Sequence, residues 1–398
     1  PIWNKKRKKI IGLNKLKRLI IILTLLVFVF GFVTVTGAQD FKIDAQSAIL
    51  IDAETGQVLY EQNADEKLPP ASITKIMTLL ITMEAIENGE LSLDDDVTIS
   101  RLAESMGGSQ IFLAEGNVVK VRDLLKAVTI ASANDASVAL AETVAGSYNN
   151  FINMMNDKAD EMGLDNTYFS NSTGLPTESD HYSTARDVAV MSRELVNYPI
   201  ILEDASIWLD YIELPDRDAM LTNTNHLVNT YPGLDGIKTG HTAAAGFSLA
   251  ATAKRGDMRL ISVVMKSRSV QAREDLTAQL LDYGFNRFTR RNYLEAGETI
   301  QNIEVEQGSK EFTTGEISKD LAVVVRRGME KTIETEIDIK DNFEFPINVG
   351  DSLGEARAVR DGEVITKVDI VATEEVNKAN FLALFWRNIV NMIGGSSE

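Results

Sequence analysis

The chain has 398 residues, enough for about two domains, and its 44% hydrophobic and 25% charged residues are typical of a globular protein. It has no cysteine, which excludes disulfides and thiolate metal sites, and its three histidines are too few and too scattered to suggest a metal cluster. The net charge is −18, and residues 1–38 contribute +8 of it with no Asp or Glu, which leaves −26 for the remainder. So acidic a body excludes a typical nucleic-acid binder, since contacts to phosphate need a basic surface.

Residues 1–38 have the order of an export signal. A basic segment is followed by the nearly all-apolar run 19–35 and then by the small residues Thr36, Gly37 and Ala38. This order predicts a secretory signal peptide over 1–38 with cleavage after Ala38. The alternative is an uncleaved membrane anchor, because the apolar run is close to the length that spans a bilayer. Both interpretations carry residues 39 onward across the membrane.

Residues 39–290 are predicted to form the first folded domain. The segment 46–60 predicts two short strands around a turn at 54–57, and the segments 247–254 and 258–266 predict a second hairpin. Between them the apolar spacing predicts helices, and another helix follows. The predicted helices cover residues 72–87, 120–131, 135–145, 150–162, 184–197 and 271–283. This order favours an α+β domain whose first and last strands pair in one antiparallel sheet.

The chain changes character near residues 287–296. The segments that follow are short and alternating, separated by Gly, Asp and Asn, and they predict a small all-β sandwich over 291–376. The last stretch, 377–398, predicts an amphipathic helix with Phe381, Leu384 and Phe385 on its apolar face. It is too short to span a bilayer, so we expect it to lie in the membrane interface; the alternative is a helix docked on its own domain.

The stretch PPASITKIMT contains Ser72 and Lys75. Ser72 is the only Ser in the chain with a Lys three residues later. Residues i and i+3 share a helix face, so the lysine amine can reach the serine hydroxyl. A neutral lysine can activate a serine, and burial on an apolar helix lowers the lysine pKa. The competing interpretation is a helix cap at Ser72 and a solvated Lys75.

Two further motifs follow. Ser132-Ala133-Asn134 joins two predicted helices, where a short loop can project polar groups into a cleft; the alternative is a plain cap of the second helix. Lys238-Thr239-Gly240 precedes the strand at 247. Its ammonium and hydroxyl can bind a carboxylate, and its glycine lets a substrate backbone approach closely; the alternative is a turn with a solvated lysine.

The order Ser-x-x-Lys, Ser-x-Asn, Lys-Thr-Gly is far more specific than any one of these motifs, and it occurs in class A β-lactamases and penicillin-binding proteins. The chain resembles the serine D-alanyl-D-alanine carboxypeptidases, or low-molecular-mass penicillin-binding proteins. The resemblance covers residues 41–393 and rests on the segments PPASITKIMT, ASANDASVALAE, NSTGLP, YSTARDVA and DGIKTGHT. It implies a mixed sheet flanked by helices, an all-helical lobe at roughly 90–200 with the three motifs at the junction, and a following β domain.

The resemblance also implies roles in the reaction. Ser72 would attack the D-Ala-D-Ala bond at the end of a peptidoglycan stem peptide, and Lys75 would accept its proton. Ser132 would relay protons and Asn134 would hold the substrate amide. The backbone N–H groups of Ser72 and His241 would form the oxyanion hole.

The same resemblance implies the ligands of the site. Lys238, Thr239 and Gly240 would bind the terminal carboxylate. Arg273 is a further candidate for carboxylate binding and is not assigned to the site. β-Lactams would acylate the serine as slowly released mimics, and no metal or organic cofactor is implied. The protein would act at the extracytoplasmic face of the bacterial membrane. One departure is Ala133, where the related motif has Asp.

Three alternatives remain open. A class A β-lactamase adds a Glu with an Asn four residues later, and no Asn between 135 and 237 has a Glu four residues before it; the extra β domain also argues against a β-lactamase. Sequence alone distinguishes poorly between a D,D-carboxypeptidase and a D,D-endopeptidase that acts on peptidoglycan cross-links. A non-catalytic wall-binding protein is disfavoured by the intact Ser72, Lys75 and Lys238.

Overall fold

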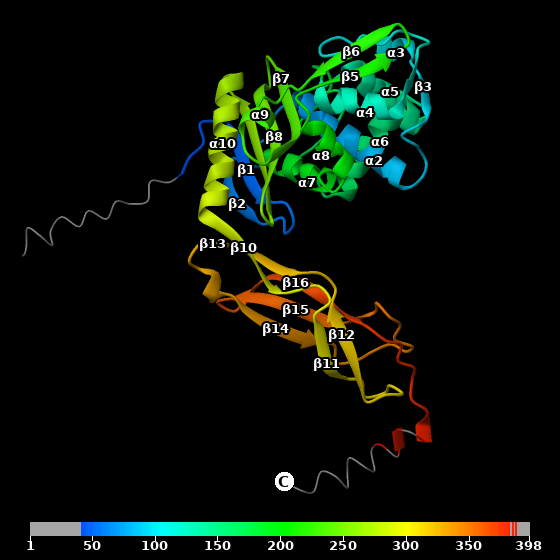
Figure 1. Ribbon diagram of the computed structural model, residues 1–398, viewed down its shortest axis with the longest axis vertical. Helices are drawn as coiled ribbons and strands as arrows, with labels where there is room; N and C mark the ends of the chain where they lie inside the picture. Colours follow the sequence, from blue (N-terminus) through cyan, green and yellow to red (C-terminus); the bar gives the residue numbers. More distant parts are fainter. Residues whose placement is uncertain (1–40, 383, 386, 388–398) are drawn as a thin grey trace, which may run out of the picture. The chain divides into compact units, whose positions relative to one another are not determined.

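The computed structural model describes residues 41–382, 384, 385 and 387 (Figure 1). The predicted signal over 1–38 and most of the predicted helix over 377–398 therefore lie outside the described residues. No helix in the described part is long and apolar enough to cross a bilayer.

A five-stranded antiparallel sheet with the order β2-β1-β9-β8-β7 organises the first domain. Its strands are β1 (Ser47–Asp52), β2 (Val58–Gln62), β7 (Leu234–Thr242), β8 (Gly246–Arg255) and β9 (Met258–Ser267). β1 pairs with β9, so the first and last strands meet as predicted. Strand β7, at one edge, carries the Lys-Thr-Gly motif.

Helices cover both faces of this sheet. Helix α10 (Val270–Arg287) packs along β8 and β9, and α2 (Lys75–Glu87) and α7 (Ala185–Leu195) lie among the helices on the other side (Figure 1). Side-chain caps begin two of these helices, since Ser269 accepts from the Ala272 N–H and Thr184 accepts from the Asp187 N–H. Helix α2 is buried on nearly all sides, as expected for an apolar helix inside a large core.

The lobe between β2 and β7 is mostly helical, and the predicted helices there are confirmed to within about two residues. Its helices are α3 (Arg101–Glu104), α4 (Val121–Ile130), α5 (Asn134–Ala145), α6 (Tyr148–Glu161), α8 (Pro199–Ala205) and α9 (Leu227–Thr230). The expectation of an all-helical lobe at 90–200 is wrong, because two short strands pair within it, and a hairpin follows. These strands are β3 (Asp96–Thr98) with β4 (Val118–Lys120), and β5 (Leu209–Leu214) with β6 (Arg217–Thr222).

Strands build most of the second domain, which confirms the predicted all-β class. Strand β10 pairs with β13, and a second sheet has the order β11-β12-β16-β15-β14. The strands are β10 (Phe288–Leu294), β11 (Thr299–Glu304), β12 (Phe312–Ile317), β13 (Leu321–Arg326), β14 (Glu334–Ile339), β15 (Ser352–Arg360) and β16 (Glu363–Ala372), with a 3-10 turn η2 (Glu330–Thr332) before β14. Valine and isoleucine side chains such as Val305, Val323 and Ile370 form its core. The described residues between 381 and 387 are helical.

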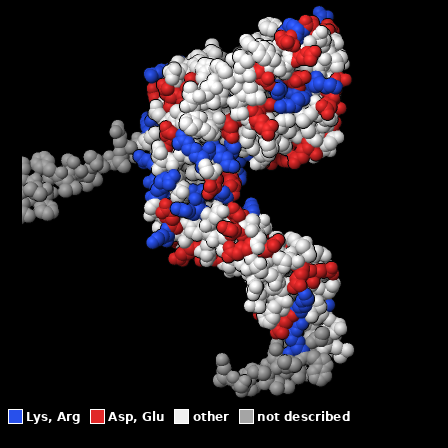
Figure 2. Space-filling view, in the orientation of Figure 1, with Lys and Arg blue, Asp and Glu red and all other residues white. Residues whose placement is uncertain are grey.

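Charge is unevenly distributed on the surface. Acidic side chains are scattered over the visible face of both domains, whereas Lys and Arg gather near the end of α10 and near β10 and β13 (Figure 2). This face therefore carries no basic surface that runs the length of a domain, in keeping with the net charge of −18.

Gly233, in the turn before β7, provides a test of the fold. Its φ is +82°, and a Cβ there would lie 2.2 Å from the Lys254 carbonyl oxygen. Gly256, in the β8–β9 turn, has φ +61° with no atom within 4 Å of a Cβ. We expect Gly256→Ala to lower the free energy of unfolding by about 1 kcal/mol, the cost of the left-handed backbone. Gly233→Ala should lower it by roughly 3 kcal/mol or more, because the backbone clash is added. Urea unfolding followed by tryptophan fluorescence measures both, and equal losses would contradict the predicted clash.

Candidate active site

Ser72 lies in a short 3-10 turn, η1 (Ala71–Thr74), that leads directly into α2. The expected start of the α-helix at residue 72 is thus wrong by three residues. The α-helix starts later because Ala71, with φ +49°, departs from helical geometry. The chain therefore enters α2 through a tighter 3-10 turn. Neither η1 nor α2 has a side-chain cap, so the interpretation of Ser72 as a helix cap is also wrong.

Lys75 is fully buried, with 0% of its surface exposed. Its Nζ lies 3.1 Å from Ser72 Oγ, 2.6 Å from Asn134 Oδ1 and 2.9 Å from the Thr173 carbonyl oxygen. The interpretation of Lys75 as a solvated surface residue is excluded. The Asn134 amide orientation is fixed by its other end, because Nδ2 donates to the Gly107 carbonyl at 2.6 Å.

The charge state of Lys75 decides how these three contacts are shared. Burial, followed by the nearby Lys238 charge, holds the pKa of Lys75 well below its usual value, and Asp135 opposes this only in part. A neutral amine has two protons and one lone pair. The Asn134 and Thr173 oxygens can only accept, so both protons are used there. The lone pair is therefore left for the Ser72 hydroxyl, and Lys75 can accept that proton.

Ser132 occupies the loop between α4 and α5 with φ +61°, in the left-handed region that side chains rarely adopt. Its Oγ is buried and has no hydrogen-bond partner among the described residues. Helix α5 begins after Ala133 without a side-chain cap, so the capping interpretation of Ser132 and Asn134 is wrong. Strained backbone and an unsatisfied hydroxyl together are typical of a functional site.

Lys238 and Thr239 lie on β7. Lys238 is 1% exposed, and within the described residues its Nζ has a single hydrogen-bond contact, to the Thr239 carbonyl at 3.5 Å. Burial, together with the charge of Arg273, lowers the pKa of Lys238 to about 7. Thr239 Oγ1 lies 2.6 Å from Thr224 Oγ1. A buried cation with so little compensation is suited to receive an anion.

Gly240 brings β7 against η1, the turn that carries Ser72. A Cβ at this position would lie 2.7 Å from the Pro70 carbonyl oxygen and 3.0 Å from Ile73 Cγ1. The glycine is therefore needed for the approach of η1. The next residue, His241, has an exposed ring stacked on Phe247 at a centroid distance of 4.0 Å. The oxyanion hole from the Ser72 and His241 backbone N–H groups stays a prediction.

These elements meet around a cavity of about 360 Å³. Its lining includes Ser72, Ser132, Thr239, Gly240, His241 and Arg273. Lys75 contacts Ser72, and Asn134 contacts Lys75. Lys238 precedes Thr239 on β7, and its charge acts on Lys75. All eight predicted site residues thus lie in or next to one site.

Sequence reasoning missed the loop that supplies the Thr173 carbonyl. The segments NSTGLP and YSTARDVA contribute to the family resemblance, but no role was assigned to them. His181 joins this loop to η1, with Nε2 2.8 Å from Thr74 Oγ1 and Nδ1 3.1 Å from the Ser170 nitrogen. Burial lowers the pKa of His181 to about 4, so the ring is neutral near pH 7. Since the Ser170 N–H donates to Nδ1, the Nε2 proton points to Thr74.

Comparison with known proteins identifies the family. Residues 34–269 match the D-alanyl-D-alanine carboxypeptidase family of peptidases. The chain belongs to this family. Residues 288–378 match the C-terminal domain of penicillin-binding protein 5. The predicted family, fold class and class of enzyme, a serine-type hydrolase of the penicillin-binding proteins, are confirmed.

Named relatives agree with this assignment. D-alanyl-D-alanine carboxypeptidase DacF of Bacillus subtilis is 41% identical over 87% of this chain and 89% of its own length. A D-alanyl-D-alanine endopeptidase of Pseudomonas aeruginosa is 32% identical over 55% of this chain and 71% of its own.

Solved structures extend the likeness to both domains. Penicillin-binding protein 5 of Haemophilus influenzae has a TM-score of 0.75 and 31% identity, covering 86% of this chain and all of its own. Penicillin-binding protein D2 of Listeria monocytogenes, solved with ampicillin bound, has a TM-score of 0.56 and 33% identity, covering 62% of this chain and 99% of its own.

The low pKa of Lys238 has a measurable consequence. The resemblance implies that a charged Lys238 binds the substrate carboxylate, so we expect kcat/KM for a peptide ending in D-Ala-D-Ala to fall as pH rises through about 7. Arg273→Gln removes the charge that depresses this pKa, so the midpoint of the alkaline fall should move to higher pH. Arg101→Gln, at an exposed position on α3, is the matched control. A midpoint that stays in place in Arg273→Gln would show that Arg273 does not act on Lys238.

Proposed function

We propose that this carboxypeptidase removes the terminal D-Ala of peptidoglycan pentapeptide stems through an acyl-enzyme on Ser72. One observation carries the proposal: a buried lysine amine at the cavity lies within hydrogen-bonding distance of the Ser72 hydroxyl and of two oxygens that can only accept. Nucleophile and base are within hydrogen-bonding distance, and the base is held by a third group, as serine acyl transfer requires.

Acylation follows from this arrangement. Ser72 Oγ attacks the carbonyl carbon of the penultimate D-Ala while its proton passes to Lys75 Nζ. The resulting oxyanion accepts hydrogen bonds from the backbone N–H groups of Ser72 and His241, and one such donor is worth roughly 3 kcal/mol. The C–N bond then breaks and the departing D-Ala nitrogen takes a proton. Ser132, whose hydroxyl is unpartnered and close to the cavity, relays that proton from Lys75.

Substrate recognition rests on the other side of the cavity. The terminal carboxylate binds Lys238 and the Thr239 hydroxyl, and Arg273, which also lines the cavity, adds positive charge. Gly240 keeps β7 beside η1, so that the carboxylate and the scissile carbonyl can be held together. Asn134 binds the substrate amide through its side-chain carboxamide, which also contacts Lys75 and the Gly107 carbonyl.

Deacylation regenerates the free enzyme. Water attacks the Ser72 ester, Lys75 takes its proton, and the serine oxygen leaves as the hydroxyl. β-Lactams would form the same ester and leave it slowly; support comes from the ampicillin-bound relative with the same fold.

An endopeptidase acting on cross-links is the second candidate, favoured by the relative of that name. That relative matches 55% of this chain, whereas the carboxypeptidase DacF matches 87%. The extent of the match therefore supports the carboxypeptidase.

We also propose that the protein acts at the extracytoplasmic face of the membrane. The basic and apolar segment over 1–38 supports export. The C-terminal segment supports anchoring, because Phe381, Leu382 and Phe385 are 81%, 67% and 51% exposed. Apolar side chains so exposed are stabilised in a membrane interface.

Ser72→Ala tests the nucleophile. We expect it to abolish release of D-Ala from a pentapeptide, a loss of about 10³-fold or more, because the proposed ester forms on the hydroxyl that this change removes. Ser147→Ala, at the cap of α6, is the matched control and should retain full activity. The same assay with a cross-linked dimer separates carboxypeptidase from endopeptidase. Continued D-Ala release by Ser72→Ala would show that the nucleophile is misassigned.

The double variant Phe381→Ser, Phe385→Ser tests the proposed C-terminal membrane anchor. It is made in a chain that begins at Gln39, so that the predicted signal peptide does not contribute to binding. We expect its binding to anionic phospholipid vesicles to fall about tenfold or more, since two exposed rings leave the apolar face. Phe312→Ser, an exposed phenylalanine on β12, is the matched control. Co-sedimentation measures the bound fraction, and unchanged binding would contradict the anchor. Deleting 378–398 from the full chain should release it from membranes, and retention would indicate an uncleaved N-terminal anchor.

A further inference from the structure

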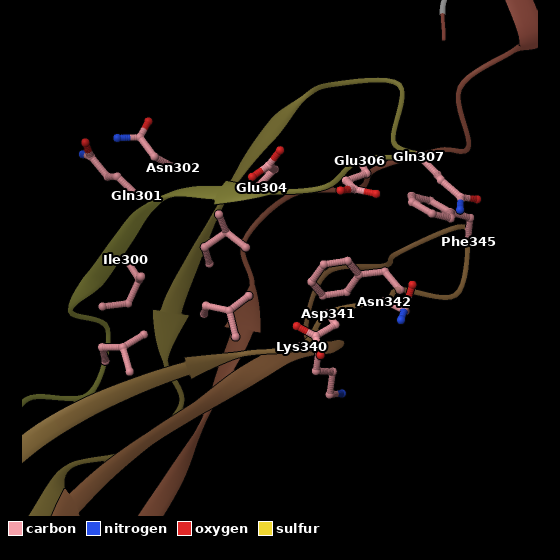
Figure 3. A pocket seen from close by; sticks show the side chains of 14 residues that line it. Ile300, Gln301, Asn302, Glu304, Glu306, Gln307, Lys340, Asp341, Asn342 and Phe345 are labelled. Atoms are coloured by element: carbon pink, nitrogen blue, oxygen red, sulfur yellow. The ribbon is translucent and has the colours of Figure 1, made fainter. Parts of the chain in front are cut away.

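The second domain has a groove between the two outermost strands of its five-stranded sheet, β11 and β14. The groove has a volume of about 470 Å³ and is lined by both strands and by residues 340–345 (Figure 3). The sheet curls so that these edges face each other without pairing. Figure 3 shows Ile300 of β11 turned toward the side of β14, with Gln301 and Asn302 turned the other way.

Strand β14 offers a regular free edge. It pairs with β15 from Glu334 to Ile339 with no shift in register, and in the part of the chain that the structure describes no strand pairs with its other side. The Lys340 N–H donates to the Leu353 carbonyl, so this residue faces β15. In an antiparallel pair the facing residues alternate. The backbone N–H and C=O groups of Thr335, Ile337 and Ile339 therefore point outward.

Strand β11 is a poorer edge. Its register with β12 shifts between Ile300 and Ile303, and Asn302 has φ +59°. A bulge of this kind interrupts a hydrogen-bond ladder and protects an edge from pairing. β11 thus forms the opposite wall of the groove, and β14 is the edge that can accept a strand.

The two faces of β14 differ in chemistry. Ile337 and Ile339 line the groove, and Ile337 is 45% exposed. The alternate residues Glu334, Glu336 and Asp338 lie on the other face. Asp338 pairs with Arg357, whereas Glu334 and Glu336 make no ion pair with any described residue. Arg357, opposite Glu336 on β15, also attracts that carboxylate. An added strand would therefore meet apolar side chains on one face and predominantly acidic side chains on the other.

We propose that β14 binds an extended segment of a partner protein in which apolar and basic residues alternate. The segment adds as a strand to the free edge, with its apolar side chains in the groove and its basic side chains beside Glu334 and Glu336. This site is separate from the active site and does not depend on the proposed function. The outward backbone groups favour a peptide over a glycan, because they match the repeat of another strand.

The test uses the full chain with Ser72→Ala, so that turnover does not contribute. A fluorescent six-residue peptide that alternates lysine and valine is titrated by anisotropy. One control peptide has three lysines followed by three valines, and a second alternates glutamate and valine. We expect the alternating basic peptide to bind about tenfold more tightly than either control, since only it matches both faces. A peptide ending in D-Ala-D-Ala should not displace it.

Three variants locate the site. Ile337→Pro removes an outward N–H without removing a bond to β15, and should weaken binding about tenfold. Ile337→Lys places a charge in the groove and should have the same effect, so it serves if the proline variant fails to fold. Glu334→Lys with Glu336→Lys should reverse the preference toward the glutamate peptide. Ile337→Val is the conservative control and should bind normally. Thermal melting checks that each variant is folded.

The proposal is overturned if the three peptides bind equally or if the Ile337 variants bind normally. It is also overturned if only N-acetylglucosamine tetramer binds, which would make the groove a glycan site. Concentration-dependent dimerisation that Ile337→Lys abolishes, with no peptide binding, would show instead that a second copy occupies the edge.

Discussion

The burial of Lys75 is the constraint on which the site depends. Removal of the lysine amine from water, beside a second buried lysine, holds its pKa well below the usual value. In the neutral form its two protons require two acceptors. Asn134 and the Thr173 carbonyl supply these acceptors from different parts of the helical lobe. The orientation of the lone pair toward Ser72 follows from their placement. Activation of the serine is therefore a property of three segments far apart in sequence.

The fold keeps those segments in contact through close backbone approaches. Gly240 lets β7 reach the turn that carries Ser72, and a Cβ on Gly174 would lie only 1.7 Å from the Ala71 carbonyl oxygen. Ala71 and Ser132 both have positive φ, each at a typical energetic penalty of about 1–2 kcal/mol. Surrounding packing holds this strain, since α2 is buried on nearly all sides. Rigid elements thus hold the reacting groups in place before substrate arrives.

Much of the fold is predictable from the sequence because its signals are local. Apolar spacing marks α2 and α4 to α7, and the turn at Arg255-Gly256-Asp257 marks β8 and β9. The Ser72, Ser132 and Lys238 motifs are recognisable because side chains carry them. The Thr173 carbonyl is not, since a backbone atom leaves no trace in residue type. The 3-10 turn at Ser72 is not recognisable from the sequence either. The same holds for the requirement for glycine at position 240, where the Pro70 carbonyl leaves no room for a Cβ. Both features arise from tertiary contacts.

The pH dependence of acylation tests the central claim most directly. The second-order rate constant for acylation of Ser72 by penicillin reports the free enzyme, and it rises only until the base has lost its proton. If burial has already removed the Lys75 proton, the rate constant does not rise above pH 7, and it falls there as Lys238 loses its charge. A rate constant that climbs about tenfold per pH unit between pH 7 and 10 would show a lysine with an ordinary pKa, and would contradict the account.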